Sequence, residues 1–230
     1  MKFRIAIAIA GASLFLAGCA SPPQQPIELA GEALATGAGR LGIAMTKLPK
    51  VDTHLPGASC LLCIAVAAAA NSSLTAHAQT LPVEELPQLK NEVADLLRKK
   101  GADVTVIAED LNFETLPDSA SKQPNAPPKD FSSLRQKYQM GKLLVIDITM
   151  LGVIRTDSAY VPTSDPKGVL QGRGFIVNLT NNTYEWYLPV SITKSTDGKW
   201  DEPPKFPGLT NAYFQSLELG RDSFLKPFNK

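Results

Sequence analysis

Residues 142–154 read KLLVIDITMLGVI, and this stretch decides the fold class. The LLVIDI core of the stretch is nearly continuous in apolar side chains, which is typical of a central strand covered on both faces. Its acidic residue, Asp147, is expected at the exposed side or near the end of the strand, because a buried carboxylate is costly unless it is paired. Residues 143–154 therefore predict the centre of a sheet.

The chain before this strand alternates between strand and helix patterns. Ala and Leu dominate the segment that starts at Ser59, which predicts a helix of about 20 residues with Ser59 as N-cap. The other predicted elements are a strand at 40–48, a helix from Pro87 that Gly101 terminates, a strand at 102–108 and a short helix at 131–138 capped by Asp130. Residues 50–57 are expected to be a connection. Alternation of this kind is typical of an α/β domain.

The chain after the central strand predicts a β-hairpin. Strands at 168–179 and 184–192 are joined by residues 180–183, where two Asn residues tolerate left-handed turn conformations. Alternation predicts that one face of the second strand carries Tyr184, Trp186, Leu188, Val190 and Ile192. Gly172 and Gly174 on the first strand leave backbone exposed where large rings can lie.

A helix at about 209–225 ends the chain. Together these elements predict a single α/β domain over residues 39–230, with a mixed sheet of about five strands and three to four helices, ending in the hairpin and the C-terminal helix. Long segments rich in Pro, at 109–129, 156–167 and 196–208, are expected to be surface loops.

The N-terminus predicts export. Lys2 and Arg4 precede an uncharged apolar run at 5–18, which is too short to span a bilayer and reads as a signal peptide over residues 1–18. The run ends in Leu16-Ala17-Gly18-Cys19, which resembles the lipobox of bacterial lipoproteins. That resemblance implies that the Cys19 thiol carries diacylglycerol and becomes the mature N-terminus. Acyl chains of this kind anchor a protein to a membrane effectively permanently.

Residues 19–38 are expected to be a lipid-anchored, flexible tether. The segment begins ASPPQQP, which cannot form a hydrophobic face and favours an extended spacer. Ala20 stands where lipoproteins retained in the inner membrane usually have Asp. The resemblance to that sorting rule favours the periplasmic face of the outer membrane.

The net charge argues against a nucleic-acid partner. Lys and Arg number 23 and Asp and Glu number 22, so the chain has no basic field that would attract phosphate. A protein partner and the membrane are the partners that we expect.

The order of the elements resembles a known group. The Cys-anchored signal, RLGIAMTKL, the helix ending in RKKG before ADVTVIA, and KLLVIDITMLG before a long hairpin are similar to small lipoproteins with a TolB-N-terminal-like domain. That group includes curli and Pel secretion lipoproteins and activator lipoproteins of peptidoglycan synthases. The resemblance implies a protein that binds other proteins or assembles into homo-oligomeric rings, without enzymatic activity and without a cofactor.

Cys60 and Cys63 form a Cys-x-x-Cys motif, the most specific local motif in the chain. At a helix start these residues can meet, whereas on a strand their Cα atoms would lie about 10 Å apart, too far for a disulfide. A structural disulfide, two buried thiols and a redox pair all remain open. The redox pair would make the chain a thiol-disulfide oxidoreductase, which is the alternative function. His54 and His77 are the other soft ligands and are expected to be surface or packing residues, so we expect no metal site.

Aromatic residues in the predicted loops indicate where a partner would bind. Tyr160 lies in the loop at 156–167, and Trp200 and Phe206 lie in the loop at 196–208. Rigid aromatic side chains at one end of a sheet are the kind of anchor that dominates binding energy at protein interfaces. We therefore expect these side chains to form the recognition surface of an envelope protein involved in assembly or secretion.

Overall fold

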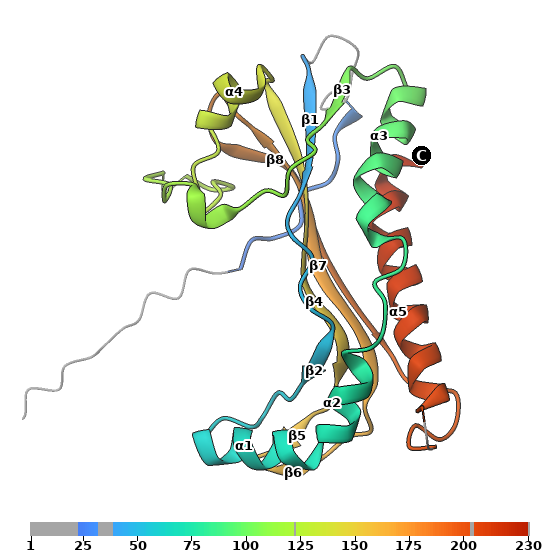
Figure 1. The fold of residues 1–230 in the computed structure, drawn as a ribbon. Helices are drawn as coiled ribbons and strands as arrows, with labels where there is room; N and C mark the ends of the chain where they lie inside the picture. Colours follow the sequence, from blue (N-terminus) through green and yellow to red (C-terminus); the bar gives the residue numbers. More distant parts are fainter. Residues whose placement is uncertain (1–22, 32–38, 122, 203–204, 230) are drawn as a thin grey trace, which may run out of the picture.

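A mixed sheet of six strands forms the centre of the computed structural model, which describes residues 23–31, 39–121, 123–202 and 205–229 (Figure 1). The strands are β1 (Leu41–Met45), β2 (Asp52–His54), β3 (Val104–Val106), β4 (Lys142–Ile154), β7 (Lys167–Asn178) and β8 (Thr183–Lys194). Their order is β3-β1-β4-β7-β8, and β2 pairs with the far end of β4. β1 runs parallel to β3 and β4, while β4, β7 and β8 are antiparallel. The predicted α/β class and the closing hairpin are confirmed.

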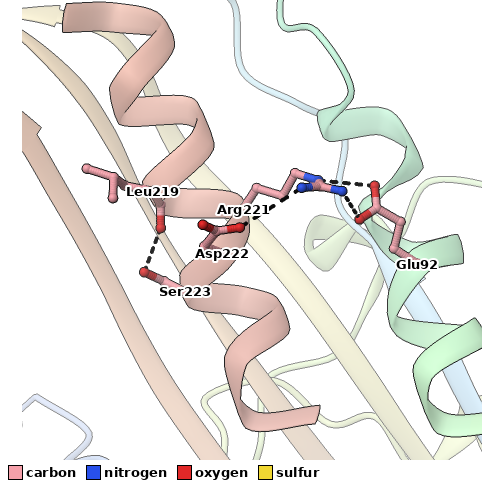
Figure 2. A network of polar contacts seen from close by, with 5 residues as sticks. All are labelled: Glu92, Leu219, Arg221, Asp222 and Ser223. Carbon is pink, nitrogen blue, oxygen red and sulfur yellow. Dashed lines mark hydrogen bonds and ion pairs between the residues drawn. The ribbon is translucent and has the colours of Figure 1, made fainter. Parts of the chain in front are cut away.

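Two helices cover one face of this sheet. The helices α3 (Leu89–Lys99) and α5 (Pro207–Leu225) pack beside each other along it (Figure 1). The guanidinium of Arg221 on α5 binds both carboxylate oxygens of Glu92 on α3, which joins the two helices (Figure 2). A two-point contact of this kind fixes the orientation of the partners as well as their distance.

The opposite face carries a shorter helix and a long loop. The helix is α4 (Ser133–Tyr138), and residues 109–129 include the 3₁₀ turn η3 (Phe113–Thr115). The helix begins at Ser133, two residues later than predicted, and its N-cap is Ser132 without a side-chain capping hydrogen bond. The predicted cap Asp130 instead accepts a hydrogen bond from the backbone N–H of Ser132 at 2.9 Å, in a turn just before the helix. Two further 3₁₀ turns are η2 (Leu86–Gln88) before α3 and η4 (Lys226–Phe228) after α5.

The central strand supplies both cores. Leu144 and Ile146 on β4 belong to the cluster beneath α3 and α5, while Leu143 and Val145 belong to the cluster beneath α4. All four side chains are almost fully buried. The sequence of β4 is continuously apolar because a core packs against each face of the sheet, as predicted.

The expectation for Asp147 is wrong. Asp147 lies on β4 with only 6% of its surface exposed. Its carboxylate accepts a hydrogen bond from Arg173 Nε at 2.9 Å, and from Thr46 Oγ1 at 2.9 Å. The register places Asp147 directly opposite Arg173 on β7, so the cost of burying the carboxylate is offset by a cross-strand cation.

The hairpin departs from simple alternation at one residue. The pairing of β7 with β8 shifts between Ile176 and Val177, which leaves Glu185 as an extra residue on β8. The bulge places Tyr184 in the cluster beneath α4, whereas Trp186 lies in the cluster beneath α5. The prediction that Tyr184 shares a face with Trp186 is therefore wrong, because a bulge inverts the alternation.

Gly174 makes room for a ring, as predicted. A Cβ atom on Gly174 would lie 2.7 Å from Trp186 Cη2, which is closer than atoms can pack. The Trp186 ring also packs against Phe228 from η4, at 5.3 Å between centroids. The glycine therefore lets the indole approach the backbone of the sheet closely.

The single long helix predicted from Ser59 is divided in two. The structure has α1 (Leu61–Ala70) and α2 (Ser72–Ala78), with a bend of 72° between them at Asn71. The Asn71 side-chain amide donates to Ala67 O at 2.8 Å, so a side chain competes for a helical acceptor at the break. Two further differences are the strand β2 within the expected connection and a hairpin of β5 (Asp157–Ser158) and β6 (Val161–Pro162) within the loop at 156–167.

Part of the predicted tether contacts the domain. Within residues 23–31, Ile27 forms an antiparallel bridge with Tyr187 on β8, with N–H to O distances of 2.9 and 3.1 Å. Leu29 packs against the cluster beneath α3 and α5. Residues 1–22 and 32–38, with the predicted signal peptide and Cys19, lie outside the described residues.

Candidate functional site

Trp200 and Phe206 come together at the end of the sheet where α2 and α5 begin. Their rings stack with 6.3 Å between centroids and 8° between planes. The guanidinium carbon of Arg155, directly after β4, lies 4.9 Å from the centroid of the Trp200 ring. We call Arg155, Trp200 and Phe206 the aromatic corner.

The Arg155 side chain joins this corner to two other segments of the chain. Its Nε donates to Ser164 O at 3.1 Å, and its Nη1 donates to Asn71 Oδ1 at 2.9 Å. Asn71 is buried at the bend between α1 and α2. The cation that faces Trp200 is therefore oriented by fixed hydrogen bonds, and such a preorganised contact costs little entropy when a partner binds.

His77 on α2 supports the other ring of the corner. Its ring lies 5.3 Å from that of Phe206, and its Nε2 lies 2.7 Å from Thr210 Oγ1 on α5. Burial, and then the charge of Lys205, lower the pKa of His77 below its usual value. Its role is packing, in agreement with the sequence-based expectation, and it keeps α2 beside the start of α5.

A hollow of about 400 Å³ adjoins the aromatic corner between α2 and α5. Its walls are His77, Lys205, Pro207, Thr210, Asn211 and Phe214. The hollow offers apolar walls from Pro207 and Phe214, together with hydrogen-bonding groups from Asn211. An apolar hollow with few polar groups at its rim is suited to receiving one side chain of a binding partner.

Tyr160 lies apart from this stack, on the turn between β5 and β6. Its side chain is 54% exposed, and Val161 beside it is 55% exposed. The structure thus brings together two of the three aromatic residues predicted to bind a partner. The third belongs to a second surface, formed with α1.

The helix α1 is apolar and exposed. Leu61, Leu62, Ile64 and Val66 are exposed, and Ala67 is its buried residue. We call Leu61, Leu62, Ile64, Val66, Tyr160 and Val161 the apolar end. Sequence analysis missed the exposure of this helix, although the absence of Asp, Glu, Lys and Arg between Asp52 and Glu84 was a visible signal.

Cys60 and Cys63 form a disulfide at the start of α1, with their Cα atoms 4.9 Å apart. Cys60 is the N-cap of the helix, and its Sγ accepts a hydrogen bond from the N–H of Cys63 at 2.9 Å. Cys60 is exposed. Of the alternatives left open by the sequence, the structure therefore contains the bridged pair, accessible to solvent.

A groove of about 620 Å³ lies between α1, α2 and the strands β2 and β4. Its apolar wall includes Ile64, Ala68, Met150 and Ile154, and Asp52 lies at its polar side. His54 also lines it, with Nε2 3.1 Å from Leu151 O. Within the described residues, no three His, Cys, Asp or Glu side chains are grouped closely enough to hold a metal ion.

Among the described residues, no single helix has the length and apolar character needed to cross a membrane. The helices α1 and α2 reach that length and apolar character only when they are counted together, across the bend between them.

Comparison with known proteins gave structural similarity alone. No family model and no curated protein matches the sequence. Similar solved structures include a PelC dodecamer from Paraburkholderia phytofirmans, with 8% identity over 89% of this chain and 94% of that chain and a TM-score of 0.35. A lipoprotein from Neisseria meningitidis has 13% identity over 78% and 96%, with a TM-score of 0.30. A protein from Xanthomonas campestris has 8% identity over 90% and 96%, with a TM-score of 0.33. The neighbours thus include a Pel protein and a lipoprotein, but at TM-scores this low they carry no argument about function.

Proposed function

We propose that this chain is a non-enzymatic lipoprotein of the outer membrane, anchored through Cys19, whose α/β domain binds a protein partner in envelope assembly or secretion. The anchor is supported by the sequence Leu16-Ala17-Gly18-Cys19 after an apolar run. The domain lies on the periplasmic side in this proposal, because export through a lipoprotein signal delivers it there.

The observation that carries the binding role is the aromatic corner beside the hollow between α2 and α5. Trp and Arg are enriched among the residues that dominate binding energy at protein interfaces. Trp200 and Arg155 are held in contact by a stack on one side and by hydrogen bonds on the other. A partner side chain placed in the hollow would lie beside these rigid groups.

Site-specific photo-crosslinking in the intact envelope tests the binding role. A photoreactive amino acid at Asn211, in the hollow, should give an adduct with a partner, whereas the same amino acid at Lys99 on α3 should not. Replacing Trp200 by Ala should abolish the Asn211 adduct while the thermal unfolding midpoint changes little. The mass of the adduct distinguishes a different protein from a second copy of this chain.

Two results would overturn the binding role. An Asn211 adduct that persists in Trp200→Ala would mean that the aromatic corner does not contribute to binding the partner. A large loss of stability in Trp200→Ala would instead identify the stack as core. Fractionation tests the anchor separately, since Cys19→Ser should leave the protein soluble in the periplasm or unprocessed.

The alternative function is thiol-disulfide exchange at Cys60 and Cys63. The observation that favours it is the exposed Cys60 at the N-terminus of α1, where the helix dipole would stabilise a thiolate. The reduction potential of the pair decides between the roles. A value below roughly −300 mV indicates a structural bridge, and a value between about −270 and −120 mV would support an oxidoreductase.

A further inference from the structure

The helix α1 is apolar around its whole circumference. Its ten residues are LLCIAVAAAA, and successive residues point about 100° apart, so no side of the helix carries a polar side chain. Leu61 is 89% exposed and Leu62 is 71% exposed, while Ile64 and Val66 are exposed by 49% and 40%. A helix that is hydrophobic all round is normally buried in a core or in a membrane.

The turn between β5 and β6 extends this surface. Asp157 N donates to Pro56 O at 2.9 Å, and Gly57 is packed so tightly against Asp157 O that a Cβ atom would not fit. This contact joins the turn to the segment that leads into α1. The six residues of the apolar end account for all the large exposed hydrophobic side chains of the described residues except Leu219 on α5.

The α1 part of the apolar end carries no charged side chain that would oppose its transfer out of water, while Asp157 of the adjoining hairpin is already buried in the domain. The segment from residue 53 to residue 83, which contains α1 and α2, has no Asp, Glu, Lys or Arg. Transfer of a charged side chain into an apolar medium is very costly, and this segment avoids that cost. The disulfide between Cys60 and Cys63 also removes two free thiols from the first turn of the helix.

We propose that the apolar end enters the boundary between head groups and acyl chains of a phospholipid bilayer. A protein partner would cover one side of α1, whereas acyl chains can cover all of its exposed sides at once, leaving only the side of Ala67 against the domain. Ten apolar residues are too few to span the bilayer and suit an interfacial position. Tyr160, on the turn that is joined to the segment before α1, is the kind of residue that lies at the level of the head groups.

This contact is additional to the anchor at Cys19 and to the aromatic corner. Hydrophobic contact drives it, because the segment at 53–83 has no Lys or Arg and the nearby guanidinium of Arg155 is engaged by Asn71, Ser164 and Trp200. Binding should therefore occur on zwitterionic lipid and should change little with ionic strength.

The test uses the full-length lipidated protein in phosphatidylcholine vesicles. Val66→Trp places a fluorophore on α1, and Leu219→Trp places the same fluorophore on the exposed side of α5. With brominated acyl chains, emission from the Val66→Trp protein should shift to the blue and be quenched. The Leu219→Trp protein and the wild type, whose Trp186 is buried and whose Trp200 lies in the corner, should show neither change.

A charge-bearing variant provides the second arm. Adding Leu61→Glu and Leu62→Glu to the Val66→Trp protein should remove most of the quenching, whereas adding Leu219→Glu should not. Neither side chain of the pair is part of the core, so circular dichroism and the thermal midpoint should stay close to those of the parent.

Two outcomes overturn the proposal. Water-like, unquenched emission at Val66→Trp means that α1 stays in solvent, and a blue shift without quenching means that a protein surface, such as a second copy of this chain, covers it. Co-flotation with the vesicles reports the anchor and bromine quenching reports α1. The failure of the anchor and the failure of this proposal therefore appear in different signals.

Discussion

Arg155 and Asn71 are joined by a hydrogen bond from Nη1 to Oδ1 at 2.9 Å, although they lie 84 residues apart in the chain. Through this bond the bend between α1 and α2 is tied to the cation that faces Trp200. The aromatic corner and the position of α1 therefore depend on the same side chain.

Replacing Arg155 by Ala should make both the aromatic corner and the helices α1 and α2 less stable locally. The buried Asn71 Oδ1 would lose its donor, which costs about 1 to 3 kcal/mol of unfolding free energy. Amide hydrogen exchange in α1 and α2 should accelerate. Replacing Arg40 by Ala is the control, because its ion pair with Asp103 is exposed and should contribute no more than about 1 kcal/mol. Unchanged exchange in α1 would contradict this role of Arg155.

Replacing Arg173 by Ala should destabilise the sheet strongly. The carboxylate of Asp147 is 8% exposed, and the substitution would leave it without its cation, which costs about 3 to 5 kcal/mol for a fully buried pair. The loss of unfolding free energy should lie near the lower end of this range, since the Arg173 side chain is 34% exposed and is therefore partly solvated. Urea unfolding measures it, and a double variant with Asp147→Asn should recover part of the loss.

Gly174→Ala should destabilise the hairpin because the new methyl group would meet the buried Trp186 ring. Overpacking of this kind costs about 1 to 3 kcal/mol. Gly141→Ala is the matched control, since no atom lies within 4 Å of a Cβ at that position. Thermal unfolding of the two variants should differ clearly, and equal midpoints would show that the indole can move aside.

Stability should fall as the pH is lowered below the usual pKa of histidine, about 6.5. The pKa of His77 is lowered in the folded state, so the unfolded chain takes up a proton first as the pH falls. The contribution of His77 to the free energy of unfolding is complete above its pKa in the unfolded chain. It is lost as the pH falls from that value to the pKa of His77 in the folded state. Replacing His77 by Gln should remove this part of the pH dependence of urea unfolding, whereas His54→Gln should retain it.

Ile27→Pro should release the N-terminal segment from β8. Proline cannot donate the hydrogen bond from Ile27 N to Tyr187 O, while Ile27→Val keeps it. Limited proteolysis should cut residues 23–31 faster in the proline variant alone, with the core unaffected. Equal cleavage of both variants would mean that the bridge does not hold the segment.

Local patterns determined the elements of this fold. Apolar continuity located β4 between two cores, periodicity located α3, and the Asn turn and Gly174 located the hairpin and the ring beside it. These predictions succeeded because each depends on neighbours in the chain, which set backbone preference and the face on which a side chain lies.

Only the tertiary structure decided what depends on distant residues. The pairing of Asp147 with Arg173 requires the strand register, and the bulge at Glu185 inverts an alternation that the sequence leaves intact. The stack of Trp200 on Phe206 depends on tertiary structure too, since Phe206 also lies against His77 on α2. An apolar helix such as α1 has the same sequence whether it lies in a core or at a surface, because burial depends on what the rest of the chain leaves uncovered.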